Sequence, residues 1–265
     1  MKKSVLITGV TGGMGKATAK LFLGKGFRVY GIDVSDGCEL PISYFKADLR
    51  KIDEVKAAFD AIKGETDSLS AIIHFAGIYR MASLVEMEEK DFEGIFDINL
   101  FGVYRVNKVF LPLLREGSKI IITSSELAPL YPLPFTGIYA VTKSAIEKYA
   151  FSLKMELQLI GISVSVIRPG AVKTELLDVS MRELDKLCEK TSLYKTNTKR
   201  FKRIVGSVES RHISSEKIAK IAGKIYTKRN PAFVYSINRN PLLRLMNVLP
   251  KRLQLYVIKK LLESR

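Results

Sequence analysis

The sequence predicts an α/β fold in which helices cover both faces of a doubly wound parallel sheet. Short runs rich in β-branched residues alternate with segments of helical periodicity, which is typical of parallel βαβ units. Several runs, such as Ala71-Ile72-Ile73 and Ile120-Ile121-Ile122, are continuously apolar, as strands buried on both faces are. We therefore expect about seven strands, at residues 4–8, 27–33, 43–48, 70–76, 119–124, 162–168 and 232–236.

A length of 265 residues fits one large or two small domains, and no linker or low-complexity segment divides residues 1–175, so we expect a single domain spanning residues 1–265. Hydrophobic residues make up 47% of the chain and charged residues 26%, which excludes a disordered or fibrous protein. Cys38 and Cys188 lie far apart in sequence and only two histidines accompany them, so we expect neither a disulfide framework nor a metal site. No long apolar span and no signal-peptide core are present, and we expect a cytoplasmic protein.

Positive charge is concentrated in the C-terminal third. Of the net charge of +16, residues 1–181 contribute +1, with 22 Lys and Arg against 21 Asp and Glu. Residues 182–265 contribute +15, with 21 against 6. No recognised module accompanies this charge, so we do not expect a nucleic-acid partner.

The basic extension at residues 240–265 interleaves Leu-rich apolar residues with Lys and Arg. Helices of this composition lie in a membrane interface and are attracted to anionic lipids. Peripheral membrane contact is therefore one interpretation. The other is that the extension closes over the substrate site or joins subunits, with its lysines exposed to solvent.

A glycine-rich turn follows the first predicted strand. The run TGVTGGMG at residues 8–15 opens a segment of helical periodicity. Glycines permit a tight turn and a close backbone approach, and the N–H groups at a helix N-terminus bind the pyrophosphate of a dinucleotide. We therefore predict a dinucleotide-binding sheet of the Rossmann type.

Asp33 ends the second predicted strand and indicates which dinucleotide binds. A carboxylate at this place accepts hydrogen bonds from the adenosine ribose and repels a 2′-phosphate. Neither Val34 nor Ser35 supplies a positive charge that would attract this phosphate. We predict that NAD(H) is favoured over NADP(H).

Tyr139 and Lys143 are the candidate acid–base pair. They lie four residues apart in a segment of helical periodicity, so they share one helix face. An ammonium beside a phenol lowers the pKa of the phenol from about 10 toward neutral pH. A phenol tuned in this way exchanges a proton with an alcohol or a ketone.

Together these motifs resemble the short-chain dehydrogenases/reductases in their single-domain form. The resemblance extends over residues 4–175, with the motifs in the expected order. It implies a cofactor site made of the glycine turn, an Asp-Leu pair that meets the adenine, a small-residue segment after the fourth strand and a Pro-Gly segment beside the nicotinamide. Besides Asp33, Tyr139 and Lys143, the residues concerned are Gly9, Thr11, Gly13, Met14, Gly15, Asp48, Leu49, Ala76, Gly77, Pro169, Gly170, Val172 and Thr174.

The resemblance also implies the catalytic roles. Tyr139 acts as general acid and base, and Lys143 lowers its pKa and holds the nicotinamide ribose. Ser125 orients the substrate oxygen, and Asn99 holds a water that relays the proton to solvent. Ser125 stands fourteen residues before Tyr139, one more than the commonest spacing, and we prefer it to its neighbours on either side.

A second departure from the family pattern is His74-Phe75, which replaces the usual Asn-Asn before Ala76-Gly77. His74 ends a buried apolar run, and we expect a buried, hydrogen-bonded histidine rather than a catalyst. The asparagine that it replaces helps to stabilise the sheet in the family.

The helix after Tyr139 carries two apolar stripes. One stripe is expected to pack on the sheet and the other against a second subunit, since the family forms dimers and tetramers through this helix. We therefore expect a homodimer or homotetramer. The first stripe is Ile146, Tyr149, Leu153, Leu157 and Ile160, and the second is Phe151, Met155 and Leu159.

The insertion at residues 176–213 is a candidate substrate lid, because ligands bind beyond the carboxyl ends of parallel strands and long insertions there are usually functional. Apolar residues of the insertion and of the segment after Ser125 are expected to line the site. These are Leu127, Leu130, Tyr131, Leu133, Phe135, Leu176, Leu177, Val179, Met181, Leu184, Leu187 and Leu193.

Such a lining favours a small-molecule substrate that is bulky and apolar. We predict an NAD(H)-dependent oxidoreductase that interconverts a secondary alcohol and a ketone on a hydroxysteroid, bile acid or other lipid. One alternative is an NADPH-dependent 3-oxoacyl-thioester reductase whose basic surface docks an acyl carrier protein or CoA. A second is a membrane-associated NAD(H)-binding protein without turnover, against which the complete set of catalytic residues argues.

Overall fold

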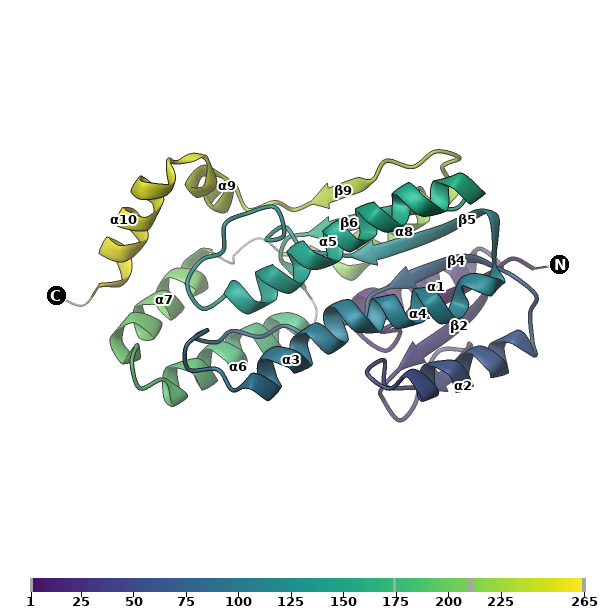
Figure 1. The fold of residues 1–265 in the computed structure, drawn as a ribbon, viewed down its shortest axis with the longest axis horizontal. Coiled ribbons are helices and arrows are strands. Elements are labelled where there is room, and N and C mark those ends of the chain that lie inside the picture. The colour runs from purple at the N-terminus through teal and green to yellow at the C-terminus, as the bar shows by residue number, and fades with distance from the viewer. Residues whose placement is uncertain (1, 174, 209–211, 264–265) are drawn as a thin grey trace.

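A seven-stranded parallel sheet in the order β3-β2-β1-β4-β5-β6-β9 forms the centre of the computed structural model (Figure 1). The structure describes residues 2–173, 175–208 and 212–263. The strand order reverses between β1 and β4, which is the doubly wound arrangement predicted from the sequence. The strands are β1 (Ser4–Thr8), β2 (Arg28–Asp33), β3 (Ser43–Lys46), β4 (Leu69–His74), β5 (Leu114–Thr123), β6 (Ser163–Pro169) and β9 (Val234–Ile237).

Helices cover both faces of the sheet and give it two cores. α1 (Gly13–Gly24) and α8 (Ser215–Thr227) pack on one face, and α2 (Ile52–Lys63), α4 (Val103–Phe110) and α5 (Gly137–Leu157) pack on the other. Ile72 belongs to one core and its neighbour Ile73 to the other. Since successive side chains of a strand point to opposite faces, a strand covered on both sides must be apolar throughout.

The predicted strands are right in number and order but not at their ends. Asp48 and Ala76, which the sequence placed in strands, follow β3 and β4, and β5 begins five residues before the predicted start. β-branched runs extend into the turns, so composition does not mark where hydrogen-bonded pairing stops. A separate two-stranded sheet of β7 (Val172–Lys173) and β8 (Ile213–Ser214) was not predicted, because two residues carry no periodic signal.

The two stripes of α5 are largely placed as predicted. Ile146 and Leu157 are buried against the sheet, whereas the second stripe of Phe151, Met155 and Leu159 is exposed. Ile160 is the exception: it is exposed, because α5 gives way to a 3-10 turn at Gln158–Ile160 and the helical register is lost.

Beyond the carboxyl ends of the strands lie four helices from the last third of the chain (Figure 1). They are α6 (Glu175–Lys190), α7 (Lys195–Val208), α9 (Pro241–Val248) and α10 (Lys251–Leu262). α7 packs against both α6 and α10, around a small apolar cluster that includes Leu184, Phe201 and Leu262. Within the described residues, no helix is long and apolar enough to cross a membrane.

The turn between β1 and α1 depends on two close backbone approaches. Gly9 has φ +68°, and a Cβ there would lie 2.5 Å from the backbone nitrogen of Ala76. A Cβ on Gly15 would lie 2.1 Å from the carbonyl oxygen of Gly9. The first helical turn is thereby held against the end of β1, with its N–H groups directed over the carboxyl edge of the sheet.

We predict that Gly15→Ala lowers the free energy of unfolding by about 2–4 kcal/mol, because the backbone atom that the new methyl group meets cannot move aside. Gly24→Ala at the end of the same helix meets nothing within 4 Å and is the matched control. It is expected to be neutral or to stabilise by up to about 1 kcal/mol. Chemical denaturation measures both, and equal effects would contradict the packing described for this turn.

Candidate active site

Asp33 lies at the carboxyl end of β2 and faces the glycine turn. Its Oδ2 accepts hydrogen bonds from the backbone nitrogen of Thr11 at 3.0 Å and from the Thr11 hydroxyl at 2.7 Å. Its Oδ1 accepts from the backbone nitrogen of Val34 at 2.8 Å. These contacts fix the carboxylate beside the glycine turn.

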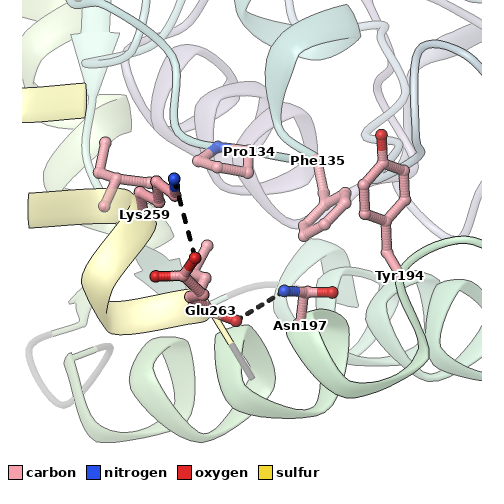
Figure 2. Close-up of a pocket in the computed structure, with 8 residues that line it drawn as sticks. Pro134, Phe135, Tyr194, Asn197, Lys259 and Glu263 are labelled. Atoms are coloured by element: carbon pink, nitrogen blue, oxygen red, sulfur yellow. Dashed lines mark hydrogen bonds and ion pairs between the residues drawn. The ribbon is translucent and has the colours of Figure 1, made fainter. Parts of the chain in front are cut away.

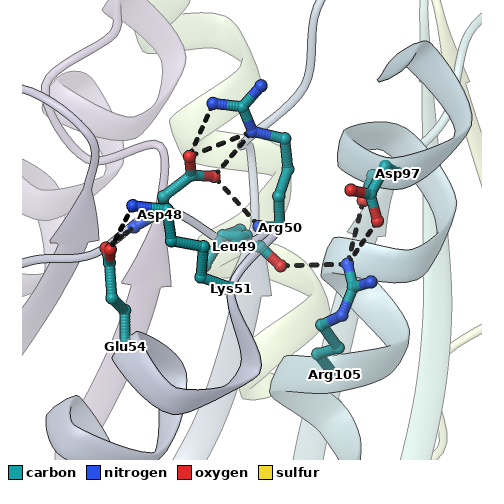
Figure 3. A network of polar contacts seen from close by, with 7 residues as sticks. All are labelled: Asp48, Leu49, Arg50, Lys51, Glu54, Asp97 and Arg105. Carbon is teal, nitrogen blue, oxygen red and sulfur yellow. Dashed lines mark hydrogen bonds and ion pairs between the residues drawn. The ribbon is translucent and has the colours of Figure 1, made fainter. Parts of the chain in front are cut away.

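Asp48 and Leu49 lie in a polar network between β3 and the start of α2 (Figure 3). Arg50 donates to the carboxylate of Asp48 through Nε at 3.0 Å and Nη2 at 2.6 Å, and this contact lowers the pKa of Asp48. Arg105 donates to the carbonyl of Leu49 at 3.2 Å and pairs with Asp97 at 2.6 Å. The loop after β3 is thereby tied to the segment that carries Asn99.

Asn99 is buried in a π-helical turn, Asp97–Gly102, between α3 (Glu89–Phe96) and α4. Its Oδ1 accepts from the backbone nitrogen of Ile78 at 2.8 Å. Its Nδ2 donates to the carbonyl of Ile78 at 3.0 Å and to the hydroxyl of Thr142 at 3.1 Å. π-helical turns are common at functional sites, and here the turn directs the amide toward the helix that carries Tyr139.

Tyr139 and Lys143 lie buried on the same face of α5, as predicted from their spacing. The Nζ of Lys143 is 5.6 Å from the centre of the Tyr139 ring and donates to the carbonyl of Thr123 at 3.2 Å. Gly77 lies against Asn99 and Lys143, because a Cβ there would lie 3.1 Å from Asn99 Oδ1 and 3.6 Å from Lys143 Nζ. Asn99 and Lys143 thus meet at one glycine, which lines the same cavity as Tyr139.

The expected lowering of the Tyr139 pKa is not found. Burial raises the pKa of Tyr139 to about 12, although the side-chain hydrogen bond with Ser125 opposes this. Burial also lowers the pKa of Lys143 to about 8, against the attraction of Glu147. Burial disfavours the charged form of each group and is the largest cause of both shifts, because the pair is enclosed by protein.

Ser125, rather than Ser124, faces Tyr139. Ser124 also lines the cavity described below, but its hydroxyl donates to the carboxylate of Glu147 at 2.7 Å, and Glu147 pairs with Arg168 of β6. Ser125 accepts a hydrogen bond from the backbone nitrogen of Leu127 at 3.2 Å and lines the cavity described below. Motif spacing did not reveal that the hydroxyl of Ser124 is bonded to Glu147.

His74 is buried as expected, with its Nε2 2.9 Å from Oδ1 of Asn107. Its Nδ1 has no hydrogen-bond partner among the described residues, so it is only half satisfied. Burial lowers the pKa of His74 to about 4, and the ring is therefore neutral at physiological pH.

A cavity of about 530 Å³ lies over Ser125, Tyr139 and Lys143. Its inner wall contains Met14, Gly77, Pro169, Gly170 and Val172 from the predicted cofactor site. Gly170 is in close contact with the chain after β9, since a Cβ there would lie 1.8 Å from the carbonyl oxygen of Asn238. Thr174, the remaining member of this segment, lies outside the described residues.

The outer wall of the cavity is apolar and comes mainly from the last third of the chain. α7, α9 and α10 supply most of it, as Phe201, Ile204, Val205, Leu242, Leu243, Met246, Ile258 and Leu261. The prediction of the lining was therefore partly wrong. Leu127 and Leu133 do line the cavity, Leu184 and Leu187 pack in the α6–α7 cluster, and Leu130, Tyr131, Met181 and Leu193 do neither. The side chains of Leu176, Leu177 and Val179 lie outside the described residues.

Glu126, next to Ser125, connects the segment after β5 to the start of α9. Its carboxylate accepts from the backbone nitrogen of Asn240 at 2.6 Å, and burial raises its pKa. Asn240 also caps α9, since its Oδ1 accepts from the backbone nitrogens of Leu242 and Leu243. The Asn-Pro pair at residues 240–241 is a helix-start signal that could have located this end of the helix.

A second hollow of about 310 Å³ lies on the other side of Ile258, which lines both. Figure 2 shows Pro134, Phe135 and Tyr194 along one side of it and Lys259 and Glu263 along the other. Asn197 of α7 donates to the carbonyl of Leu262 at 2.7 Å, which fastens the end of α10 to α7.

The fold and the residues around Tyr139 define an NAD(P)-dependent dehydrogenase or reductase. A family model described as short chain dehydrogenase matches residues 3–184, and the chain belongs to this family. Across the described residues, no group of three or more His, Cys, Asp and Glu could hold a metal ion.

Three relatives illustrate the range of similar proteins. Oxidoreductase UcpA of Salmonella typhimurium is 31% identical over 193 residues, which is 68% of this chain and 73% of the relative. Estradiol 17-beta-dehydrogenase 2 of Mus musculus is 30% identical over 190 residues, 66% of this chain and 49% of the relative. The 3-ketodihydrosphingosine reductase of Bacteroides thetaiotaomicron is 26% identical over 231 residues, 86% of this chain and 85% of the relative.

Two solved structures have the same fold. A short chain dehydrogenase/reductase from Burkholderia phymatum in complex with NAD has a TM-score of 0.74 and 22% identity, and the match covers 88% of each chain. ElxO with NADP bound has a TM-score of 0.71 and 23% identity, with 89% of this chain and 97% of that chain covered.

We predict that Lys143→Met raises the free energy of unfolding at pH 7 by about 1–3 kcal/mol, because it removes a buried charge. Because the folded-state pKa of about 8 lies below the ordinary lysine value of 10.5, the stability advantage of the variant is largest below pH 8 and shrinks as the pH rises toward 10.5. Denaturation of both proteins across this range measures the difference. The exposed Lys148→Met on the same helix is the control; a constant difference between wild type and Lys143→Met would contradict the burial cost.

Proposed function

We propose that this protein is an NAD(H)-dependent oxidoreductase that interconverts a secondary alcohol and a ketone on a bulky apolar lipid. One observation carries the proposal: the buried pair of Tyr139 and Lys143 opens into a cavity of about 530 Å³ whose outer wall is apolar. A pocket of this size and lining encloses a large apolar molecule and leaves few polar groups to orient it.

In the proposed mechanism, Tyr139 exchanges a proton with the substrate oxygen. At a pKa of about 12 its phenol is protonated at neutral pH, which suits donation to a ketone oxygen. Ser125, hydrogen-bonded to that phenol, orients the same oxygen. The nicotinamide cofactor supplies or accepts the hydride when bound.

Lys143 and Asn99 complete the proposed proton path. The ammonium of Lys143 stabilises the phenolate that is left when Tyr139 gives up its proton. Asn99 is fixed by the backbone of Ile78 and by Thr142, and so holds a rigid polar position beside Gly77. We assign to it the binding of the water that passes the proton onward.

The residues that would hold the cofactor fit a dinucleotide. Gly9 and Gly15 let the turn after β1 pack closely at the start of α1, whose N–H groups are suited to bind a pyrophosphate, and Gly77 and Gly170 line the cavity without side chains. Asp33 stands where the adenosine ribose is bound in this fold, which supports NAD(H) as the preferred cofactor. The solved neighbours include complexes with NAD and with NADP.

We predict that Asp33→Asn raises the ratio of kcat/KM for NADP(H) over NAD(H) by at least about tenfold, because it removes the repulsion of the 2′-phosphate and keeps an acceptor for Thr11. The matched control is Asp36→Asn, three residues on, whose exposed carboxylate pairs with Lys46. Kinetics with both cofactors measure the ratio. If Asp36→Asn changes it as much as Asp33→Asn, the carboxylate of Asp33 does not select the cofactor.

Two substrate classes fit the apolar wall. The estradiol dehydrogenase among the relatives supports a hydroxysteroid or bile acid. The ketodihydrosphingosine reductase supports a long-chain ketone, because its match covers most of the chain and because the second hollow beyond Ile258 would extend the cavity for a chain. The observation that favours the second class is this shared wall at Ile258.

We also propose a homo-oligomer formed through α5. Phe151, Met155 and Leu159 form an exposed apolar stripe there, and exposed stripes of this kind normally mark an interface. The stripe lies on the side of α5 away from the catalytic residues that face the cavity.

The test of the proposed function is turnover by the purified protein. Hydroxysteroids, bile acids, long-chain lipid ketones and 3-oxoacyl thioesters are offered with NAD(H) and with NADP(H), and absorbance of the reduced cofactor is followed. We expect turnover of a steroid or long-chain lipid with NAD(H). Activity on thioesters with NADPH alone would instead establish the 3-oxoacyl-thioester reductase.

On the best substrate, we predict that Tyr139→Phe lowers kcat by about 10²–10⁴-fold and leaves cofactor affinity within a few-fold, because only the proton exchange is lost. Tyr149→Phe is the control: its hydroxyl lies on the same helix, bonds Asn107 and does not line the cavity. Cofactor affinity is measured by fluorescence titration. Substantial turnover by Tyr139→Phe would rule out its assignment as the general acid and base.

A further inference from the structure

We propose that the outer surface of α9 and α10 docks on an anionic lipid bilayer, and that the substrate enters the cavity from that bilayer. The α9–α10 surface comprises Leu242, Arg244, Leu245, Val248, Arg252, Leu253, Leu255, Tyr256, Lys259 and Lys260, all of them exposed. The docking step stands on this surface alone. The entry step rests on the proposed function, since it needs a lipid substrate.

Exposed apolar residues occur along both helices. On α9, Leu242, Leu245 and Val248 recur every three residues on one side, and Leu245 and Val248 are 62% and 81% exposed. On α10, Leu255 and Tyr256 are 68% and 58% exposed. Single exposed apolar residues are common, but a row of them on two neighbouring helices marks a binding surface.

Basic residues lie within the apolar ones on α10. Arg252, Tyr256 and Lys260 are four residues apart and therefore share one face, and the Nζ of Lys260 lies 5.9 Å from the centre of the Tyr256 ring. Leu255 and Lys259 form a second row of the same kind. Leucines that enter the acyl boundary and lysines that reach its anionic head groups are the combination found in helices that lie on membranes.

The opposite sides of the two helices form the rim of the active-site cavity. Leu243 and Met246 of α9 and Ile258 of α10 face the cavity, whereas Leu242 and Leu261 line it and are also half exposed. An apolar molecule leaving a bilayer below these helices would therefore pass from one apolar surface to another.

Contacts to the body of the protein hold the surface in place. Glu126 accepts from the backbone of Asn240, and Asn247 accepts from the backbone nitrogen of Tyr131 at 2.6 Å. The Nζ of Lys251 lies 4.7 Å from the centre of the Tyr131 ring, and Asn197 holds the far end of α10. The helices are thus presented in a fixed orientation, and little ordering is required on binding.

Charge favours a bilayer over a second copy of this chain. The α9–α10 surface carries Arg244, Arg252, Lys259 and Lys260, of which the last two pair with Glu263, and a two-fold interface through α9 and α10 would bring two such basic surfaces together. An anionic bilayer complements the charge, and each Lys or Arg close to it contributes to the affinity.

The test is binding of the purified full chain to vesicles of phosphatidylcholine, with or without about one third phosphatidylserine. We expect it to float with the anionic vesicles and to remain free with the neutral ones, and to dissociate as salt is raised. Arg252→Glu with Lys260→Glu is expected to weaken binding at least about tenfold. Leu245→Ser with Val248→Ser is expected to weaken it about tenfold, through the lost apolar contact.

Lys56→Glu with Lys63→Glu is the matched control, because these exposed lysines of α2 make the same charge change at the opposite end of the molecule (Figure 1). It is expected to bind as the wild type does. Equal loss in the control, or absence of binding to anionic vesicles, would overturn the proposal. A fall in oligomeric state caused by the α9–α10 variants, measured by sedimentation without lipid, would identify the surface as a contact between subunits and would also overturn it.

Turnover of a detergent-solubilised substrate tests the proposed function without a bilayer, and so separates it from the proposed docking. None of the four substituted residues of α9 and α10 lines the cavity, so these variants are expected to keep kcat while losing the stimulation by anionic vesicles. If the protein binds vesicles but turns over no lipid, the docking surface is supported and the proposed lipid substrate is wrong. Equal rates with and without anionic vesicles would overturn entry from the bilayer.

Discussion

The burial of the Lys143 ammonium is the constraint on which the rest of the site depends. An ionised group enclosed by protein is costly unless polar partners replace its water. The carbonyl of Thr123 accepts from it at 3.2 Å, and Glu147 attracts it from one helical turn further along α5. Glu147 is held in turn by Arg168 of β6. The position of the charge therefore depends on the placement of α5 over the carboxyl ends of β5 and β6, and a shift of this helix along the strands would separate Lys143 from the carbonyl of Thr123 and Glu147 from Arg168.

The same burial explains why the fold was easier to predict than the electrostatics of the site. Continuous apolar runs such as Ile120-Ile121-Ile122 predict strands because covering helices require them, wherever those helices lie. The four-residue spacing of Tyr139 and Lys143 places them together on one face for a similarly local reason. Their pKa values depend on the protein that encloses them, which the spacing does not contain. Burial raises the pKa of Tyr139, whereas a neighbouring ammonium alone would lower it.

Contacts between residues that are far apart in sequence could not be predicted from the motifs either. Asn99 was predicted from its motif, but its contacts with Ile78 and Thr142 arise only when the π-helical turn meets α5. Glu126 could not be connected with Asn240, because 114 residues separate them. The apolar lining was sought in the insertion at residues 176–213, yet much of it lies on α9 and α10. Composition identified an apolar, basic extension without showing which of its sides faces the cavity.

The residues around Tyr139 and much of the outer wall of the cavity come from different parts of the chain. The family match ends at residue 184, and it contains the glycine turn and the residues around Tyr139. Much of the outer wall of the cavity comes from α7, α9 and α10, which follow. The family therefore determines the chemistry, whereas much of the cavity wall belongs to a region whose net charge differs sharply from that of the remainder. Since α9 and α10 face the cavity with one side and solvent with the other, the same two helices carry both an apolar wall of the cavity and the surface that we propose to dock on a bilayer.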